Sequence, residues 1–202
     1  MKTIRFTFLA LALLLCTNFY AQSSNQAKNV LDKVSKVLEK SGGASANFSV
    51  ISSQYGNTKG TIFIKGKKFK ALTPQATIWF DGKTQWTYMK KTNEVNISTP
   101  NEAQRMSMNP YSFMTIYKNG YQISMKASTN YNIYLKAIHP ARSLQEIYIT
   151  VNKRYQPQKI KFLQNGKWVT INITNIRVGK QPYKLFHFNA KETDKAEIID
   201  LR

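Results

Sequence analysis

Two histidines are the first side chains to consider for catalysis or metal binding. His139 and His187 lie far apart in the sequence, and His139 precedes Pro140 in an evident loop. Zinc sites and catalytic triads need several such groups brought together, so neither is indicated. The G-x-S-x-G, HExxH and Walker signatures are also missing from the sequence. The sequence therefore predicts a protein that is not an enzyme and that uses no metal or cofactor.

Asp81 and Cys16 are the remaining candidates for chemistry. Asp81 could act as a general base, but it precedes Gly82, and aspartate favours such turns because its side chain hydrogen-bonds to nearby backbone. We therefore favour a structural role for Asp81. Cys16 is not expected to carry lipid, because Leu15 stands where lipid attachment needs a small residue. It lies in a segment that we expect to be removed, which leaves no disulfide or thiol chemistry even in an oxidising compartment.

The amino-terminal segment has the pattern of a signal peptide. Lys2 and Arg5 precede an almost unbroken apolar run from Phe6 to Phe19, and a small residue, Ala21, follows shortly after it. The run is short for a membrane span, which needs about 20 apolar residues. We therefore expect residues 1–21 to be a cleaved signal peptide, with the mature protein beginning near Gln22 in the periplasm.

The rest of the chain is strongly basic and long enough for one domain. The formal net charge is +20, and loss of Lys2 and Arg5 leaves +18. Such a charge favours anionic partners: nucleic acid, anionic lipid headgroups or acidic protein surfaces. Export makes nucleic acid the least expected of the three. A merely solvated surface is an equal alternative, because lysines are scattered along nearly every segment and also protect exposed sheet edges. Residues 22–202 contain no linker or repeat, so we expect a single domain.

Two segments are predicted to be helical. Between Ala27 and Leu38 apolar residues recur at helical spacing, and Gly42 follows as a stop signal. A second, short helix is predicted from Pro110 to Tyr117, with Asn109 as its cap. Both helices carry too many apolar side chains to stand in solvent, so each is expected to cover something apolar.

Most of the remaining chain is predicted to be strand. The central stretch from Thr77 to Ile97 is rich in aromatic and β-branched residues and contains two or three short strands, with Asp81-Gly82 as the first turn. About ten or eleven strands at nearly regular spacing predict a mainly β (α+β) domain, built as an antiparallel barrel or a strongly curved sheet. The other expected strands are 47–54, 59–65, 67–72, 121–126, 131–138, 144–152, 157–164 and 168–177, with 197–202 as a last strand or turn.

Several of these segments together resemble the LolA family, the periplasmic carriers that take lipoproteins to the outer membrane. The resemblance lies in DGKTQWTY from Asp81 to Tyr88, NPYSFM from Asn109 to Met114, and GTIFIKGKKF from Gly60 to Phe69. The amphipathic helix before Phe48 and the signal peptide agree with it. The resemblance covers nearly the whole mature chain in order. It implies an unclosed β-barrel with a lid of short α-helices, and a cavity between them that takes acyl chains.

The implied function is that of a periplasmic carrier without enzymatic activity, and it assigns roles to particular residues. Its partners would be the acyl chains of lipoproteins, an inner-membrane donor complex, an outer-membrane acceptor and, transiently, an anionic membrane surface, with the carrier acting as a monomer. The expected lid residues are Val30, Val34, Phe113, Met114 and Ile116. The expected cavity residues are Phe48, Phe63, Phe69, Trp79, Trp86, Tyr88, Phe162 and Trp168. Each of them taken singly could instead be ordinary core, because strand alternation does not say which face is inside.

One position departs from the family pattern. The family commonly has an arginine after the strand that matches Thr61 to Lys65, and this arginine holds the lid by hydrogen bonds; here the position is Gly66. Lys65, Lys67 and Lys68 lie beside it, but lysine lacks the planar fork of arginine. Closure of the lid by that contact is therefore in question, and cargo or partners could differ from those of the family.

Two other classes of protein stay open on the sequence. A structural or adaptor module, or another lipid-binding module, could share the fold without transferring lipoproteins. A single-stranded nucleic-acid binder could use basic and aromatic residues in alternation, as in the stretch from Lys65 to Lys70. The signal peptide argues against nucleic acid.

Overall fold

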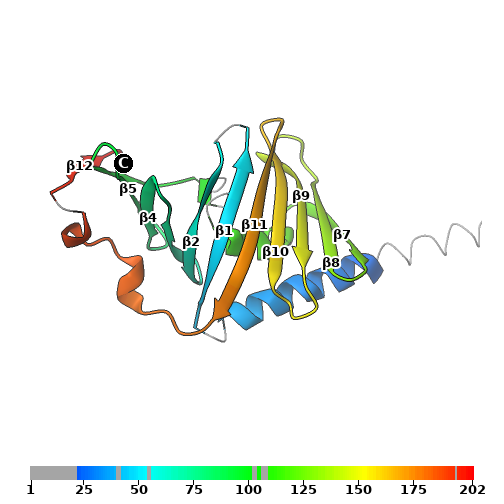
Figure 1. Ribbon diagram of the computed structural model, residues 1–202. Coiled ribbons are helices and arrows are strands. Elements are labelled where there is room, and N and C mark those ends of the chain that lie inside the picture. Colours follow the sequence, from blue (N-terminus) through cyan, green and yellow to red (C-terminus); the bar gives the residue numbers. More distant parts are fainter. Residues whose placement is uncertain (1–21, 40–41, 54–55, 102–103, 106–108, 194) are drawn as a thin grey trace, which may run out of the picture.

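The protein is built on one large curved sheet, seen in a computed structural model. The structure describes residues 22–39, 42–53, 56–101, 104–105, 109–193 and 195–202, so the predicted signal peptide lies outside the described residues. Helical residues 22–39 run beside the β7 to β10 end of the sheet (Figure 1). Within the described ranges, we found no helix that is both long enough and apolar enough to span a bilayer.

In the part of the chain that the structure describes, twelve strands form the sheet in the order β12-β6-β5-β4-β3-β2-β1-β11-β10-β9-β8-β7. Two antiparallel meanders, β1 to β6 and β7 to β11, are joined by pairing of β1 with β11. The outermost strands, β7 and β12, lie at opposite edges and leave the sheet unclosed (Figure 1). The strands are β1 Ala44–Ser52, β2 Thr58–Lys65, β3 Lys68–Leu72, β4 Ala76–Phe80, β5 Gln85–Met89, β6 Glu94–Ser98, β7 Tyr121–Ala127, β8 Tyr131–Ala137, β9 Leu144–Val151, β10 Pro157–Gln164, β11 Lys167–Val178 and β12 Glu197–Asp200.

The predicted fold class is confirmed, with two corrections of detail. The sheet has twelve strands instead of ten or eleven, and β12 pairs with β6 in parallel, which makes the sheet mixed. The predicted α-helix Pro110 to Tyr117 is two 3₁₀ segments, η1 Pro110–Met114 and η2 Ile116–Lys118. Their backbone bonds span three residues, as from Ser112 N–H to Asn109 O (2.9 Å). The segment is short, and short helical connectors commonly adopt this tighter geometry.

The main core lies on the inner face of the sheet, which is the face covered by helix 22–39 and η1. Ala27, Leu31 and Val34 of the helix are buried with Phe113 and Met114 of η1. Strand β9 supplies Ile147, Ile149 and Val151 by simple alternation.

A polar contact ties the helix to η2. The Tyr117 hydroxyl donates to Asp32 Oδ1 at 2.6 Å. Burial, together with the Asp32 carboxylate, raises the pKa of Tyr117 far above its usual range. The phenol therefore keeps its proton, and the hydrogen bond holds η2 to the helix at neutral pH.

A second apolar cluster lies on the outer face, under a segment that we call the strap, residues 179–193. The strap contains η3 Tyr183–Phe186 and η4 Ala190–Glu192 and leads from β11 to β12 along the β2 to β5 side (Figure 1). Trp79 of β4 and Phe186 are buried there, outside the main core. A 2.7 Å ion pair joins Lys70 of β3 to Glu192 of the strap. Trp79, from the aromatic stretch between Thr77 and Ile97, therefore packs under the strap and not in the main core.

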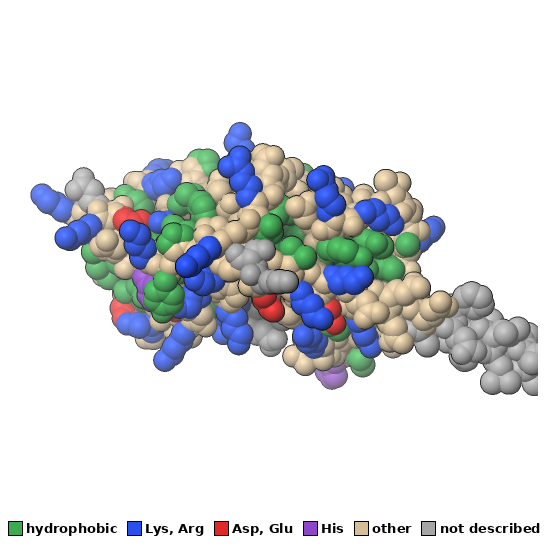
Figure 2. Space-filling model, turned by 90° about the horizontal axis from the view of Figure 1, so that it is seen from below, with side chains coloured by type: hydrophobic (Ala, Val, Ile, Leu, Met, Phe, Trp, Pro, Cys, Tyr) green, Lys and Arg blue, Asp and Glu red, His purple; other side chains and the backbone are tan. Residues whose placement is uncertain are grey.

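Positive charge is spread widely over the molecule. Figure 2 shows lysine and arginine side chains distributed across the face seen from below, with few acidic side chains between them. This agrees with 30 basic against 10 acidic residues in the chain. On this face the excess is not gathered in one place, so it does not by itself mark a site.

Candidate functional site

An apolar cavity of about 430 Å³ lies on the inner face of the sheet. Its volume is within the range of about 300–1,000 Å³ that is typical of ligand sites. Residues from both meanders line it, so it lies across the seam at which β1 meets β11. The lining residues are Phe48, Val50, Thr58, Ile62, Phe69, Ala71, Thr73, Ile78, Gln104, Phe162, Gln164, Val169 and Ile171.

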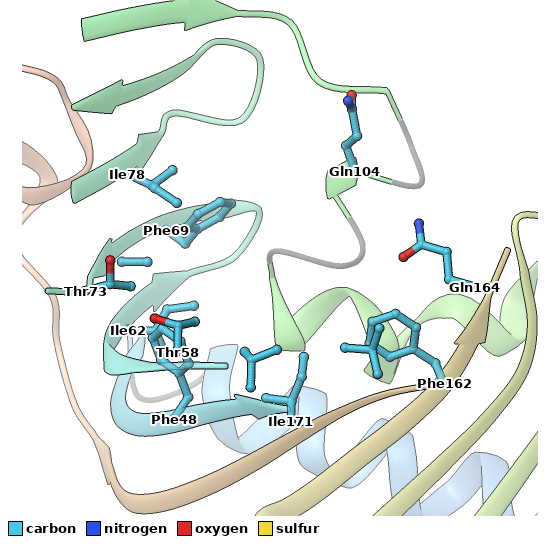
Figure 3. A pocket seen from close by; sticks show the side chains of 13 residues that line it. Phe48, Thr58, Ile62, Phe69, Thr73, Ile78, Gln104, Phe162, Gln164 and Ile171 are labelled. Atoms are coloured by element: carbon cyan, nitrogen blue, oxygen red, sulfur yellow. The ribbon is translucent and has the colours of Figure 1, made fainter. Parts of the chain in front are cut away.

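Strand alternation places these side chains on one surface. Phe48 and Val50 are two residues apart on β1, and Phe69 and Ala71 are two apart on β3, so each pair points to the same face. In Figure 3 the side chains of Ile78 and Phe69 stand on one side of the space and those of Phe162 and Ile171 on the other. Most of the wall formed by the described residues is therefore hydrocarbon and aromatic ring, and none of these lining residues is charged.

The polar lining residues contrast with these walls. Gln104 and Gln164 are the glutamines of the lining, and Figure 3 shows both away from the group formed by Phe48, Ile62 and Ile171. Thr58 is the first residue of β2, and Thr73 directly follows the last residue of β3. Both threonines therefore lie at the ends of strands. An apolar interior with a few neutral polar groups suits a molecule with a hydrocarbon chain and a polar end.

Three of the eight residues predicted for the cavity line it: Phe48, Phe69 and Phe162. Phe63 is half-buried between Ile62 and Ile64, whose side chains are buried in the main core. By alternation Phe63 therefore faces the outer side of β2 and is not a lining residue. Aromatic character alone does not separate the two faces.

The three central aromatic residues lie on the outer face. Trp79 meets Phe188 of the strap edge-on, with ring centroids 5.5 Å apart, and Trp86 stacks on the same ring at 6.2 Å. The Tyr88 hydroxyl donates to Asn93 Oδ1 at 3.0 Å. These residues anchor the strap and the β5 to β6 turn, and they are not among the lining residues of the cavity.

Trp168 is the last of the predicted cavity residues, and it lies on the outer face of β11. It is 38% exposed and lies beside Tyr148 of β9, with ring centroids 5.9 Å apart. Its neighbour Val169 lines the cavity, which follows from alternation. Trp168 therefore forms part of a surface and not of the cavity.

The five residues predicted for the lid are all buried in the main core: Val30, Val34, Phe113, Met114 and Ile116. None is a lining residue of the large cavity. Phe113 contacts Phe162, which does line it, with ring centroids 5.2 Å apart. Met114 borders a separate space of about 30 Å³ that also touches Phe48 and Ile62. The residues predicted for the lid thus form a second layer behind the cavity wall.

Sequence reasoning missed the aliphatic part of the lining. Val50, Ile62, Ile78, Val169 and Ile171 contribute much of the wall. The missed signal was the period of two: a step of two residues from Phe48 reaches Val50 on the same strand face. Selection by aromatic side chain alone does not identify these smaller aliphatic residues.

Gly66, at the position where the resemblance implies an arginine, occupies a turn. Gly66 has φ 56° between β2 and β3, a backbone conformation that favours glycine. The neighbouring lysines contact the strap: Lys65 Nζ donates to Gln181 O at 3.2 Å, and Lys68 Nζ lies 4.0 Å from the centre of the Tyr183 ring. Lys67 borders a polar hollow together with Arg105. Two of the three lysines therefore hold the carboxyl-terminal part of the chain.

The candidates for catalysis have structural roles. Asp81 Oδ1 accepts from the backbone N–H groups of Lys83 and Thr84, both at 2.9 Å, as expected for a turn. His139 Nδ1 accepts from the Ala141 N–H, and the His187 ring lies against Tyr183. The part of the chain that the structure describes contains no group of three or more potential metal-binding side chains.

The fold and the cavity define an unclosed β-barrel protein with an apolar interior that opens between two meanders. The family model described as outer membrane lipoprotein carrier protein LolA matches residues 17–167, and the chain belongs to that family. Proteins of this family are periplasmic, non-enzymatic carriers. Most of β11, the strap and β12 lie beyond the matched range. No curated protein matches the chain.

Solved structures share the fold at low sequence identity. An uncharacterized conserved protein from Thermus thermophilus has 12% identity and a TM-score of 0.59, covering 87% of this chain and 99% of its own. A DUF1329 family protein from Desulfovibrio piger has 9% identity and a TM-score of 0.50, covering 83% and 98%. A LolA superfamily protein from Nitrosomonas europaea has 12% identity and a TM-score of 0.45, covering 80% and 97%. At such identities the first two matches establish the architecture alone.

Proposed function

We propose that this protein binds the acyl chains of lipoproteins in the 430 Å³ cavity and carries them through the periplasm from the inner to the outer membrane. The observation that carries the proposal is an apolar cavity in a member of the lipoprotein carrier family. Each CH₂ group removed from water is favoured by about 0.8 kcal/mol, so a hydrocarbon-walled cavity can bind acyl chains without specific polar contacts. A donor complex and an acceptor at the two membranes complete the proposed cycle.

The cavity also explains how release can compete with binding. Its wall is formed by separate side chains of two meanders, and its described lining residues include no charged group. Transfer to an acceptor therefore exchanges one apolar contact for another and breaks no strong polar bond. The free energy of transfer from water to the cavity can therefore be large, while the free energy of transfer from the cavity to a second apolar site is small.

The test fills the cavity without changing the fold. In the mature chain, Ala71→Phe places a ring on the inner face of β3, at a lining position. Thr174→Phe is the matched control, because Thr174 is an exposed residue that lines an outer groove on β11. We expect Ala71→Phe to weaken binding of a fluorescent fatty acid by about tenfold or more, equal to about 1.4 kcal/mol, and the control to bind normally.

Two results would contradict the proposal. One is a wild-type protein that binds no fatty acid and no lipoprotein when purified from its own envelope and examined by native mass spectrometry, as a filled structural or adaptor module would behave. The other is an equal effect of Ala71→Phe and Thr174→Phe on the affinity for the probe. Thermal melting of both variants checks that each is folded.

A further inference from the structure

The outer face of the β7 to β11 half carries an exposed aromatic patch that the carrier function does not use. The patch consists of Tyr134, Tyr148 and Trp168, on β8, β9 and β11, with Ile51 of β1 beside them. Tyr148 is 43% exposed, Trp168 38% and Ile51 54%. The strap covers β3 to β5 instead. Large rings exposed together on one face are a feature of interaction surfaces.

The rings are held in a fixed arrangement by register and hydrogen bonds. Tyr134 pairs directly with Tyr148, and their ring centroids are 4.8 Å apart. Both hydroxyls donate to Glu146 Oε2, each at 3.2 Å. Burial and the Glu146 carboxylate raise the pKa of both tyrosines, so the phenols stay protonated and continue to donate. The patch is therefore organised in advance.

A lysine lies against the rings, and acidic groups are nearly missing from these strands, all of which the structure describes. Lys161 pairs with Tyr148 across the strands, and its Nζ lies 4.4 Å from the centre of the Trp168 ring. Glu146 is the one acidic residue of β7 to β11, and two tyrosine hydroxyls already bind it. The basic residues of the same strands are Lys126, Lys136, Lys159, Lys161, Lys167 and Arg177. The charge of this half is suited to an anionic partner.

We propose that this patch docks the protein on an anionic lipid bilayer. Tryptophan and tyrosine are amphipathic rings that concentrate at membrane interfaces, and each nearby lysine adds attraction to anionic headgroups. The strand residue next to Trp168 is Val169, which lines the cavity. Trp168 points to the outer face and Val169 to the inner face, so docking through Trp168 leaves one layer of sheet between the headgroups and the cavity. The inference rests on the proposed function only in that a carrier loads and unloads at a membrane.

The proposal is tested with vesicles and not with the acyl probe, so that the two proposals can fail separately. The mature chain has three tryptophans, and among them Trp79 and Trp86 contact the strap. Vesicles that contain phosphatidylglycerol and brominated lipid should quench the fluorescence of Trp168. We expect Trp168→Phe to remove most of this quenching while fatty-acid binding is unchanged. Quenching that persists in Trp168→Phe would overturn the proposal.

Charge variants test the lysines with two pairs that change the net charge equally. Lys159→Gln with Lys161→Gln should weaken binding to the anionic vesicles by about 30-fold, because each lysine near the surface contributes about 1 kcal/mol. The matched control is Lys91→Gln with Lys180→Gln, two exposed lysines outside β7 to β11. Equal losses in the two pairs, or equal binding of the wild type to phosphatidylcholine, would show a general charge effect or a neutral contact and overturn the proposal.

A third variant separates a bilayer from a protein partner. Replacing both Tyr148 and Trp168 by threonine keeps β propensity and removes the rings. We expect lower vesicle binding in flotation and no change in sedimentation behaviour. Unchanged flotation together with loss of a dimer would assign the patch to a contact between copies of this chain, and the membrane proposal would be wrong.

Discussion

The two halves of the sheet use opposite faces. In the β7 to β11 half, helix 22–39 and η1 cover much of the inner face, although Phe162, Val169 and Ile171 border the cavity, and the outer face exposes aromatic rings to solvent. In the β2 to β5 half, the strap covers the outer face, and inner-face residues such as Ile62, Ala71 and Ile78 border the cavity. The β2 to β5 half therefore has a covering segment on its outer face, and the outer face of the β7 to β11 half has its aromatic rings exposed.

This difference shows how a thin wall can be kept beside an empty space. A strand that borders a cavity loses packing on that side, since an unfilled space provides no contacting atoms. Trp79, Trp86 and Phe188 supply packing on the opposite side. The aromatic centre of the sequence is therefore important to the cavity because it supports the wall from behind.

The largest expected effect comes from removing packing in the filled half. Phe113 is fully buried against Phe162, and Phe113→Ala should lower the free energy of unfolding by about 3–5 kcal/mol. Ile78 is half-buried beside the cavity, so Ile78→Ala should lower the free energy of unfolding by less, below about 2 kcal/mol. Urea denaturation of both variants measures the difference. Equal losses would show that the two halves are packed alike.

The strap should respond to loss of its ion pair. The Lys70 side chain is 11% exposed, and Glu192, at 42%, is its acidic partner at 2.7 Å. Glu192→Gln leaves a mostly buried ammonium without a carboxylate and should destabilise by about 1–2 kcal/mol. The double variant Lys70→Met with Glu192→Gln should recover part of this loss, because methionine needs no polar partner. A double variant less stable than Glu192→Gln would contradict this account.

The smallest expected effect concerns the carboxyl-terminal edge. Asp200 accepts hydrogen bonds from the Arg202 side chain and backbone, which lower the pKa of Asp200 to about 2. The folded carboxylate is thus favoured above its ordinary pKa of 3.8, and this contribution is lost as the pH falls toward 2. NMR titration should find Asp200 near 2, rising toward its ordinary pKa in Arg202→Ala. A titration midpoint that Arg202→Ala leaves unchanged would show that Arg202 is not the cause.

Local signals in the sequence predicted most of the sheet. Hairpin pairs such as Asn165-Gly166 locate turns because both residues take positive φ, 50° and 72° here. Strand β10 has the predicted bounds, Pro157 to Gln164, and most of the others differ by a few residues. The type of helix in the segment from Pro110 could not be predicted in this way, because α and 3₁₀ helices share the same cap signals.

The faces of the strands could not be predicted in the same way. In β4 all five residues from Ala76 to Phe80 are buried or half-buried, so the usual alternation of exposed and buried positions is lost. The cause is the strap, whose own segment has no regular period that would predict its position. Trp79 and Phe80 therefore look alike in sequence and lie on opposite faces.

The central position of β1 has a consequence for the order of folding. Each meander pairs neighbours in sequence, but the seam joins Ala44 to Val178, which lie far apart in the sequence. Contacts between such distant residues form slowly, because the closure entropy of the loop precedes any gain from pairing. The cavity spans this seam, so a chain emerging amino terminus first can complete the binding space only after β11 has arrived. Until then Phe48 and Val50 stand on an unpaired strand edge, which is a surface prone to aggregation.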